Sequence, residues 1–206
     1  MSQFLSIHPQ TPQPRLIRQV AVVVNRGGVI AYPTDSCYAL GTSVANTTGL
    51  ERICRIRDID PGHRFTLLLR DLSEVGIYAN FGTPVYRLLK ATTPGPYAFL
   101  LPATREVPRR LQDAKRKTIG LRVPDHPVAQ ALLEELGAPM MTSSLILPGE
   151  DAALTDPEFI RDRLEHQLDL IVDGGPCSSE PTTVVDLTGD VPEVVRVGKG
   201  DPSPFG

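Results

Sequence analysis

Helix-like and strand-like patterns alternate along the whole 206-residue chain. Near the start, four apolar residues recur at helical spacing and stop before the pair Gly27-Gly28, where a glycine can take the left-handed conformation that ends a helix: Leu16, Val20, Val23 and Val24. The next segment, 29–34, reads as a buried strand that Pro33 interrupts. A chain in which strands and helices take turns packs its helices on a sheet. We therefore expect an α/β (α+β) fold, a twisted mixed parallel and antiparallel sheet with flanking helices.

The remaining segments continue this alternation. Helices are expected over 50–57, 84–91 and 126–136, and strands over 65–70, 97–103, 118–124, 139–147, 169–175, 182–188 and 193–198. One domain should span 9–206, with 1–8 as an N-terminal extension. Residues 148–156 are expected to form a mobile loop and residues 200–206 a loose tail.

Composition excludes several classes of protein. No stretch reaches the roughly 18 apolar residues that a membrane helix needs, and the N-terminus lacks a basic start and an apolar core. We expect a cytoplasmic protein with no membrane partner. The three cysteines, Cys37, Cys54 and Cys177, are an odd number without CxxC spacing, which argues against a disulfide framework and a zinc site. No metal-ligating residues are predicted.

The charge is unevenly distributed. The net charge is −3, yet residues 105–122 hold seven basic residues against two acidic ones. Such a run fits a solvated face and an anion- or RNA-binding surface equally well. The candidate RNA contacts are Arg109, Arg110, Lys115, Arg116 and Lys117.

The clearest polar feature is the strand end Tyr32-Pro33-Thr34-Asp35-Ser36. Hydroxyls and a carboxylate at the edge of a sheet can hydrogen-bond a small polar substrate. Thr34 and Asp35 could equally cap their own backbone in an ordinary turn, and the spacing alone favours the turn.

Two arginines, Arg55 and Arg57, lie at the end of an expected helix. Residues two apart do not share a helix face, so both can reach one anion only if the helix ends near Arg55, which Asp58 and Pro61 make plausible. Guanidinium groups suit phosphate because they offer paired donors. A solvated helix end fits the spacing as well. Further polar residues stand at other strand ends: Arg122, Ser143, Ser144 and Arg196.

These motifs together, and in this order, resemble the YrdC/YciO family of threonylcarbamoyl-adenylate synthases. The segments that carry the resemblance are YPTDSCYALG, RIR, TTPGPYAFLLPA, IGLRVPDHP, PTTVVDLTG and VVRVG. Two others, HRFTLLLRDLSE and TSSLILPG, look closer to the YciO branch than to the main synthase branch.

The resemblance implies a YrdC-like fold around a basic central cavity. It also implies a reaction in which L-threonine and bicarbonate form a carbamate that attacks the α-phosphate of ATP, with Mg²⁺ present and pyrophosphate leaving. The partners implied are tRNA threonylcarbamoyl-transfer proteins and tRNA or double-stranded RNA. Catalytic roles fall on Thr34, Arg55 and Arg57, and substrate contacts on Thr34, Tyr38 and His63. Nucleotide contacts fall on Arg55, Arg57, Arg122, Ser144, Thr182 and Arg196.

Three positions depart from the family pattern. Arg55 replaces a lysine, Ala98 replaces a threonine and Ile146 replaces an asparagine. A lost buried hydrogen-bond partner costs roughly 1–3 kcal/mol, about 5- to 150-fold in rate or affinity. We therefore expect a YciO-type paralogue whose synthase activity is slow or redirected to another acceptor. The alternatives are an RNA-binding protein without catalysis and a pocket that binds a nucleotide or another anion.

Overall fold

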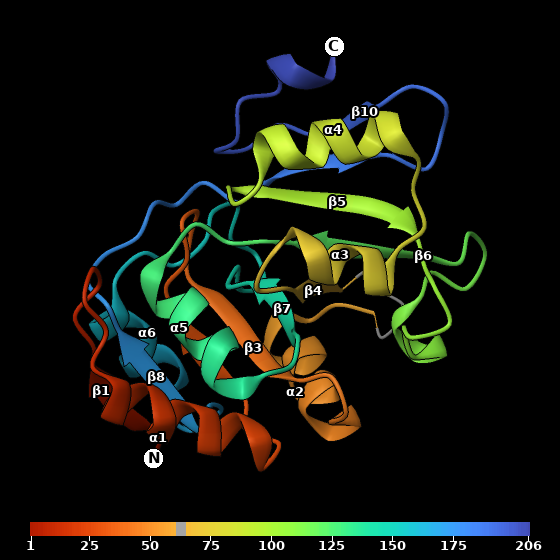
Figure 1. Ribbon diagram of the computed structural model, residues 1–206. Coiled ribbons are helices and arrows are strands. Elements are labelled where there is room, and N and C mark those ends of the chain that lie inside the picture. Colours follow the sequence, from red (N-terminus) through yellow and green to blue (C-terminus); the bar gives the residue numbers. More distant parts are fainter. Residues whose placement is uncertain (61–64) are drawn as a thin grey trace.

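The computed structural model of the chain, described for residues 1–60 and 65–206, has a long mixed sheet as its central element (Figure 1). In the described part the sheet has ten strands in the order β1-β8-β2-β3-β7-β4-β6-β5-β9-β10. The strands are β1 Gln3–Ser6, β2 Ile30–Tyr32, β3 Ala39–Ser43, β4 Thr66–Leu68, β5 Tyr97–Pro102, β6 Thr118–Arg122, β7 Met140–Ser144, β8 Leu170–Asp173, β9 Thr183–Asp186 and β10 Glu193–Arg196. The pairs β1/β8, β2/β8, β4/β6 and β5/β9 are parallel and the other pairs are antiparallel, which confirms the predicted mixed sheet.

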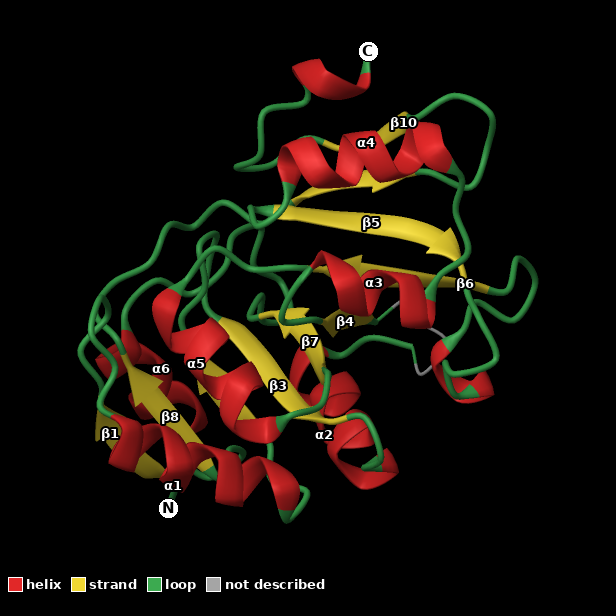
Figure 2. Cartoon of the chain, in the orientation of Figure 1, coloured by secondary structure: helices red, strands yellow, loops and turns green. Residues whose placement is uncertain are grey.

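Helices cover both faces of this sheet (Figure 2). They are α1 Pro14–Asn25, α2 Thr47–Arg57, α3 Leu72–Tyr78, α4 Thr83–Thr92, α5 Pro127–Leu136 and α6 Pro157–Leu164, with short 3-10 turns η1 Arg109–Leu111 and η2 Ser203–Phe205. The helix α1 packs against α5 on the face nearer the viewer, and α2 and α6 lie behind the sheet (Figure 1). None of the helices in the described part of the chain is long and apolar enough to cross a membrane.

Proline, glycine and aspartate residues explain where several of the helices begin or end. The first helix starts with Pro14 and gives way to Gly27 at φ 84°, as the glycine pair predicts. The helices α3 and α6 were not expected from apolar spacing, yet each starts at an aspartate whose carboxylate accepts two backbone N–H bonds, Asp71 and Asp156. The capping residues were therefore a usable signal for both helices.

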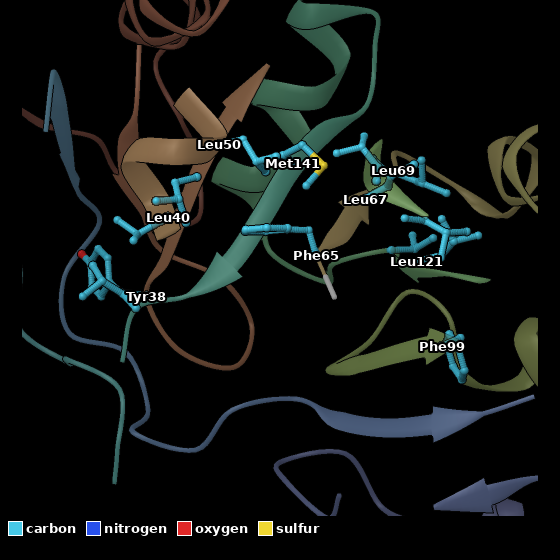
Figure 3. Packing of buried hydrophobic residues seen from close by; sticks show 14 of the residues in the cluster. Tyr38, Leu40, Leu50, Phe65, Leu67, Leu69, Phe99, Leu121 and Met141 are labelled. Carbon is cyan, nitrogen blue, oxygen red and sulfur yellow. The ribbon is translucent and has the colours of Figure 1, made fainter. Parts of the chain in front are cut away.

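Strand alternation sends neighbouring side chains to opposite sides of the sheet, where two hydrophobic clusters form. Leu67 and Met141 belong to the cluster under α2, whereas Leu68 and Met140 belong to the cluster under α1 and α5. Figure 3 shows the first cluster running from Tyr38 past Met141 to the strands β6 and β5. The first cluster therefore extends over strands from both ends of the sheet order, and the single domain over 9–206 stays a prediction.

Both ends of the chain are packed. Residues 1–8, expected as an extension, contain β1, which pairs with β8, and Ile7, which is buried. The prediction of a loose tail over 200–206 is wrong, because the ring of Phe205 is buried at 5.7 Å from the Tyr97 ring centroid. In the predicted mobile loop 148–156, Leu154 is also buried, and its N–H donates to the Leu145 carbonyl at 3.0 Å.

Candidate functional site

A cavity of about 220 Å³ lies where the end of α2 meets the strands β7, β9 and β10. Polar and apolar side chains share its lining, which consists of Arg57, Thr66, Ala98, Leu100, Thr142, Ser143, Ser144, Ile146, Thr182, Val184, Val195 and Arg196. Four of the residues predicted to bind nucleotide are therefore gathered around one hollow: Arg57, Ser144, Thr182 and Arg196.

Arg57 reaches this cavity from the last turn of α2. Its Nη1 donates to the Ser143 hydroxyl, and its Nε donates to the Ile146 carbonyl at 3.3 Å. These two bonds hold a half-buried guanidinium against the end of β7, and its Nη2 makes no hydrogen bond in the described contacts.

Arg196 approaches the same cavity from β10. Its Nη2 donates to the Thr182 carbonyl at 2.8 Å and to the Thr182 hydroxyl at 3.3 Å. The adjacent Thr183 hydroxyl donates instead to the Gly200 carbonyl and is buried away from this cavity. Of the two threonines, Thr182 is thus the one that lines this cavity.

Two arginines, Arg57 and Arg196, line the hollow, and none of its lining residues is acidic. Burial lowers the pKa of Arg57, and the positive charge of Arg196 lowers it further. Burial also lowers the pKa of Arg196. In the described part of the chain, neither arginine forms an ion pair with a carboxylate. An anion in the cavity would relieve both the desolvation and the mutual repulsion.

Arg122 lies beside this cavity in a different electrostatic setting. Its Nη2 pairs with Asp35 and donates to the hydroxyls of Thr34 at 3.1 Å and Ser36 at 3.0 Å. The side chains of Arg122 and Asp35 are only 4% and 8% exposed, so the pair is desolvated and its charges cancel. Arg122 therefore organises the 34–36 loop, and its charge is already compensated.

Thr34 sits in the local turn that its spacing favoured. Its hydroxyl donates to the Cys37 carbonyl at 2.6 Å and accepts from the Ser36 N–H at 3.2 Å. Asp35 does not cap this turn, because its second carboxylate oxygen accepts from the Asp125 N–H at 3.1 Å. Thr34 is buried and does not line the 220 Å³ cavity.

A small void of about 30 Å³ joins the Arg122 region to the main cavity. Arg122 lines it, together with Thr66, Thr142, Ser144 and Thr182, which also line the main cavity. The Nε of Arg122 is buried and has no hydrogen-bond partner among residues 1–60 and 65–206. The void has about the volume of one water molecule in liquid, so it can hold a single acceptor atom or a water.

The lining of the cavity also includes apolar side chains, among them two of the positions that depart from the family pattern. Ala98 is the register partner of Val184 across the parallel β5/β9 pair. Leu100 on β5 and Val195 on β10 also line the cavity, and Ile146 lines it from the residues after β7. The two lost polar groups, at positions 98 and 146, thus fall in the same cavity as Arg57 and Arg196.

Other predicted site residues lie elsewhere. Arg55 is exposed and does not line the cavity, because α2 continues through Arg57 and ends only at Asp58, at φ 49°. The expectation that the helix ends early enough for both arginines to converge is therefore wrong. Tyr38 is buried and donates to the Gly175 carbonyl at 2.8 Å. His63 lies outside the described residues.

The basic residues 105–117 occupy the connection between β5 and β6. Part of this connection surrounds a second hollow of about 770 Å³, lined by residues that include Arg105, Arg109 and Lys117. Two of the predicted RNA contacts have internal partners, since Arg116 pairs with Asp186 at 3.2 Å and Arg110 donates to the Val44 carbonyl at 2.7 Å. RNA binding by Arg109, Arg110, Lys115, Arg116 and Lys117 stays a prediction.

Sequence reasoning missed part of the cavity lining. Thr66 and Thr142 face each other in the register of β4 and β7, and neither stood out in the sequence. A hydroxyl on an otherwise apolar strand was the available signal. No sequence signal marked the apolar lining residues Leu100, Val184 and Val195, because buried strands and ligand pockets contain the same apolar side chains.

Comparison with known proteins places the chain in a family. Residues 22–198 match the family model for Sua5, YciO and YrdC proteins, described as "Telomere recombination". The chain belongs to this family. It is 57% identical to the uncharacterized protein YciO of Escherichia coli (strain K12) over 205 residues, covering all of both chains. The crystal structure of E. coli YciO superposes with a TM-score of 0.97 over the full length of both.

More distant relatives carry a functional name. A threonylcarbamoyl-AMP synthase of Vibrio vulnificus (strain YJ016) is 30% identical over 161 residues, covering 77% of this chain and 86% of the relative. The fold also matches P. abyssi Sua5 complexed with L-threonine, at a TM-score of 0.87 and 23% identity, over 96% of this chain and 58% of that one. The family thus includes threonylcarbamoyl-AMP synthases, and the YrdC-like fold expected from the motifs is confirmed.

Proposed function

We propose that this chain is a nucleotidyltransferase-type enzyme, similar to L-threonylcarbamoyladenylate synthases, with a weakened or redirected reaction. The observation that carries the proposal is the pair Arg57 and Arg196, which face one hollow without a carboxylate partner in the described residues. Two cations at one site, a half-buried Arg57 and a more exposed Arg196, are suited to a polyphosphate, which carries several negative charges. The named synthases in the family support ATP as the polyphosphate.

The proposed reaction joins a carbamate to AMP. A carbamate oxygen forms a bond to the α-phosphorus of ATP, and the bond from that phosphorus to the bridging oxygen breaks. Pyrophosphate leaves with both electrons of the broken bond. Arg57 and Arg196 would neutralise the charge on the phosphates, which is the main demand of phosphoryl transfer. Mg²⁺ would arrive with the phosphates, since it is usually held by substrate oxygens and few carboxylates.

The size of the cavity sets how much of the reactants it can enclose. Its 220 Å³ is less than the roughly 300–1,000 Å³ of most ligand pockets. The cavity would therefore hold the reacting phosphates and the acceptor, with the nucleoside extending outward. The product would pass to tRNA threonylcarbamoyl-transfer proteins.

The test is pyrophosphate release from ATP with bicarbonate and a panel of amino acids that includes L-threonine. The variant Arg57→Ala should lower the rate about 10- to 150-fold, because a hydrogen bond to a charged group contributes roughly 1.5–3 kcal/mol. Arg15→Ala is the matched control, since Arg15 is exposed on α1 and does not line the cavity. Pyrophosphate release that is equal in the wild type and in Arg57→Ala contradicts the proposal. Saturable ATP binding without any release would instead support a nucleotide-binding protein without chemistry.

A further inference from the structure

We infer that the small void beside Arg122 receives one phosphoryl oxygen of the ligand, and that Thr66 and the Nε of Arg122 contact this oxygen. The inference rests on the proposed function and specifies how its site holds a phosphate. Its structural basis is a buried donor that lacks an acceptor in the described residues, at a void of about 30 Å³ next to the cavity that Arg57 and Arg196 line.

The Nε of Arg122 is a hydrogen-bond donor without an acceptor. The Arg122 side chain is 4% exposed, and its Nη2 is already bonded to the 34–36 loop. The single N–H of Nε finds no acceptor in the described part of the chain, although the side chain lines the void. A buried donor of this kind is unfavourable when unpaired, so an acceptor atom in the void would stabilise the bound state.

Thr66 brings a hydroxyl to the same void. It pairs in register with Gly120 of β6 and with Thr142 of β7, and Ser144 lies two residues after Thr142 on the same side of its strand. A Cβ at Gly120 would lie 2.8 Å from the Thr66 Oγ1, so a glycine at this strand position leaves room for the hydroxyl. In the described contacts, neither the Thr66 hydroxyl nor the Ser144 hydroxyl has a hydrogen-bond partner.

Two further hydroxyls can donate toward a ligand even though they already accept. The Ser143 hydroxyl accepts from Arg57, and the Thr182 hydroxyl accepts from Arg196. A hydroxyl keeps one proton to donate after it has accepted a hydrogen bond. The void and the cavity are thus rich in donors, and none of their lining residues is acidic.

The shape of this space suits a phosphoryl group. Six residues line both the void and the cavity, which makes the two spaces neighbours: Thr66, Ala98, Thr142, Ser143, Ser144 and Thr182. The void has room for a single acceptor atom. A tetrahedral phosphoryl group can place one oxygen there and direct its other oxygens toward Arg57 and Arg196. Hydrogen bonds from uncharged donors to such a charged oxygen are stronger than those between neutral groups.

The experiment measures binding of an ATP analogue that cannot be cleaved between its α- and β-phosphates, by calorimetry on the full-length protein. Thr66→Val should raise the Kd about 10- to 150-fold, because it removes one hydrogen bond to a charged oxygen. Thr118→Val is the matched control, since Thr118 is 5% exposed on the adjacent strand β6 and lines neither space. Its Kd should equal that of the wild type, and thermal unfolding of both variants checks that they are folded.

AMP and inorganic pyrophosphate, used as separate probes, show which phosphate supplies the oxygen. Weaker AMP binding in Thr66→Val assigns the α-phosphate, whereas weaker binding of pyrophosphate alone assigns the β- or γ-phosphate. Either result supports the inference.

A crystal structure with the analogue bound provides a readout that does not depend on a variant. A phosphoryl oxygen should lie within about 3.2 Å of the Arg122 Nε. A water molecule in that place beside the bound analogue overturns the inference. An equal Kd in the wild type and Thr66→Val, together with weaker binding in Arg57→Ala, also overturns it and leaves the proposed function standing. No binding of the analogue to the wild type contradicts the proposed function itself.

Discussion

Arg122 and Asp35 have a structural role beside the cavity, unlike the arginines that line it. The basic Arg122 and the acidic Asp35 neutralise each other in a buried ion pair near the cavity. Hydrogen bonds from Arg122 to the 34–36 loop hold that loop in place. Removing one partner of such a pair leaves an uncompensated charge, which typically costs 3–5 kcal/mol. The charge available for a ligand therefore comes from Arg57 and Arg196, whereas the Arg122–Asp35 pair holds the 34–36 loop in place.

His126 provides a prediction at the scale of the residue. Its Nδ1 accepts from the Val128 N–H at 3.3 Å and caps α5, and burial lowers its pKa below the ordinary histidine value of 6.5. The unfolded chain therefore takes up a proton first as the pH falls. The free energy of unfolding should drop from about pH 7 through pH 6.5 toward the folded pKa, with a slope of at most about 1.4 kcal/mol per pH unit.

The matching variant is His126→Asn, which keeps a capping oxygen and removes the titrating group. Urea unfolding at several pH values should show a smaller slope in this variant between pH 7 and pH 5. His166→Asn is the control, because the His166 side chain is 75% exposed, and it should keep the wild-type slope. An unchanged slope in His126→Asn contradicts the assignment.

At the scale of the element, the short turn η2 closes the core from the C-terminus. Phe205 is 5% exposed, and its ring packs against those of Tyr97 and Phe99 of β5, with centroid distances of 5.7 and 6.0 Å. Phe205→Ala should lower the free energy of unfolding by about 3 kcal/mol, as expected when a buried aromatic side chain is deleted. Val197→Ala, at a 64% exposed position, should change it little. Chemical denaturation measures both, and a Phe205 variant as stable as the Val197 variant would show that the tail is not part of the core.

Helices and strands with a strong apolar periodicity could be predicted from the sequence. Those that depend on contacts with distant parts of the chain could not. The helix α1 and the strands β5 to β10 follow apolar patterns that are visible in the sequence. Strand β3, Ala39–Ser43, was missed because its small and polar residues carry little strand signal. The site was predictable in part, since the family motifs identified Arg57, Thr182 and Arg196. The position of Arg55 depended on where α2 ends, and helix ends are the least certain part of a sequence-based prediction.

At the scale of the whole molecule, the first residues complete the sheet. Strand β1 covers one edge of β8, and Ile7 is 2% exposed in the cluster beneath α1. A variant that lacks residues 1–8 should unfold at lower denaturant concentration and tend to associate, because β8 would become an uncovered edge. Denaturation and light scattering measure these changes. A truncated protein as stable and monodisperse as the full chain would show that residues 1–8 are an independent extension.

The walls of the cavity come from residues far apart in the sequence, from Arg57 to Arg196. During synthesis, a nascent chain would have to expose its last two strands outside the ribosome before the pocket existed. Neither nucleotide nor amino acid could then assist the early steps of folding, and their stabilising effect would begin only with the finished polypeptide. Premature termination between β9 and β10 would leave a product that has most of the strands of the sheet and lacks Arg196.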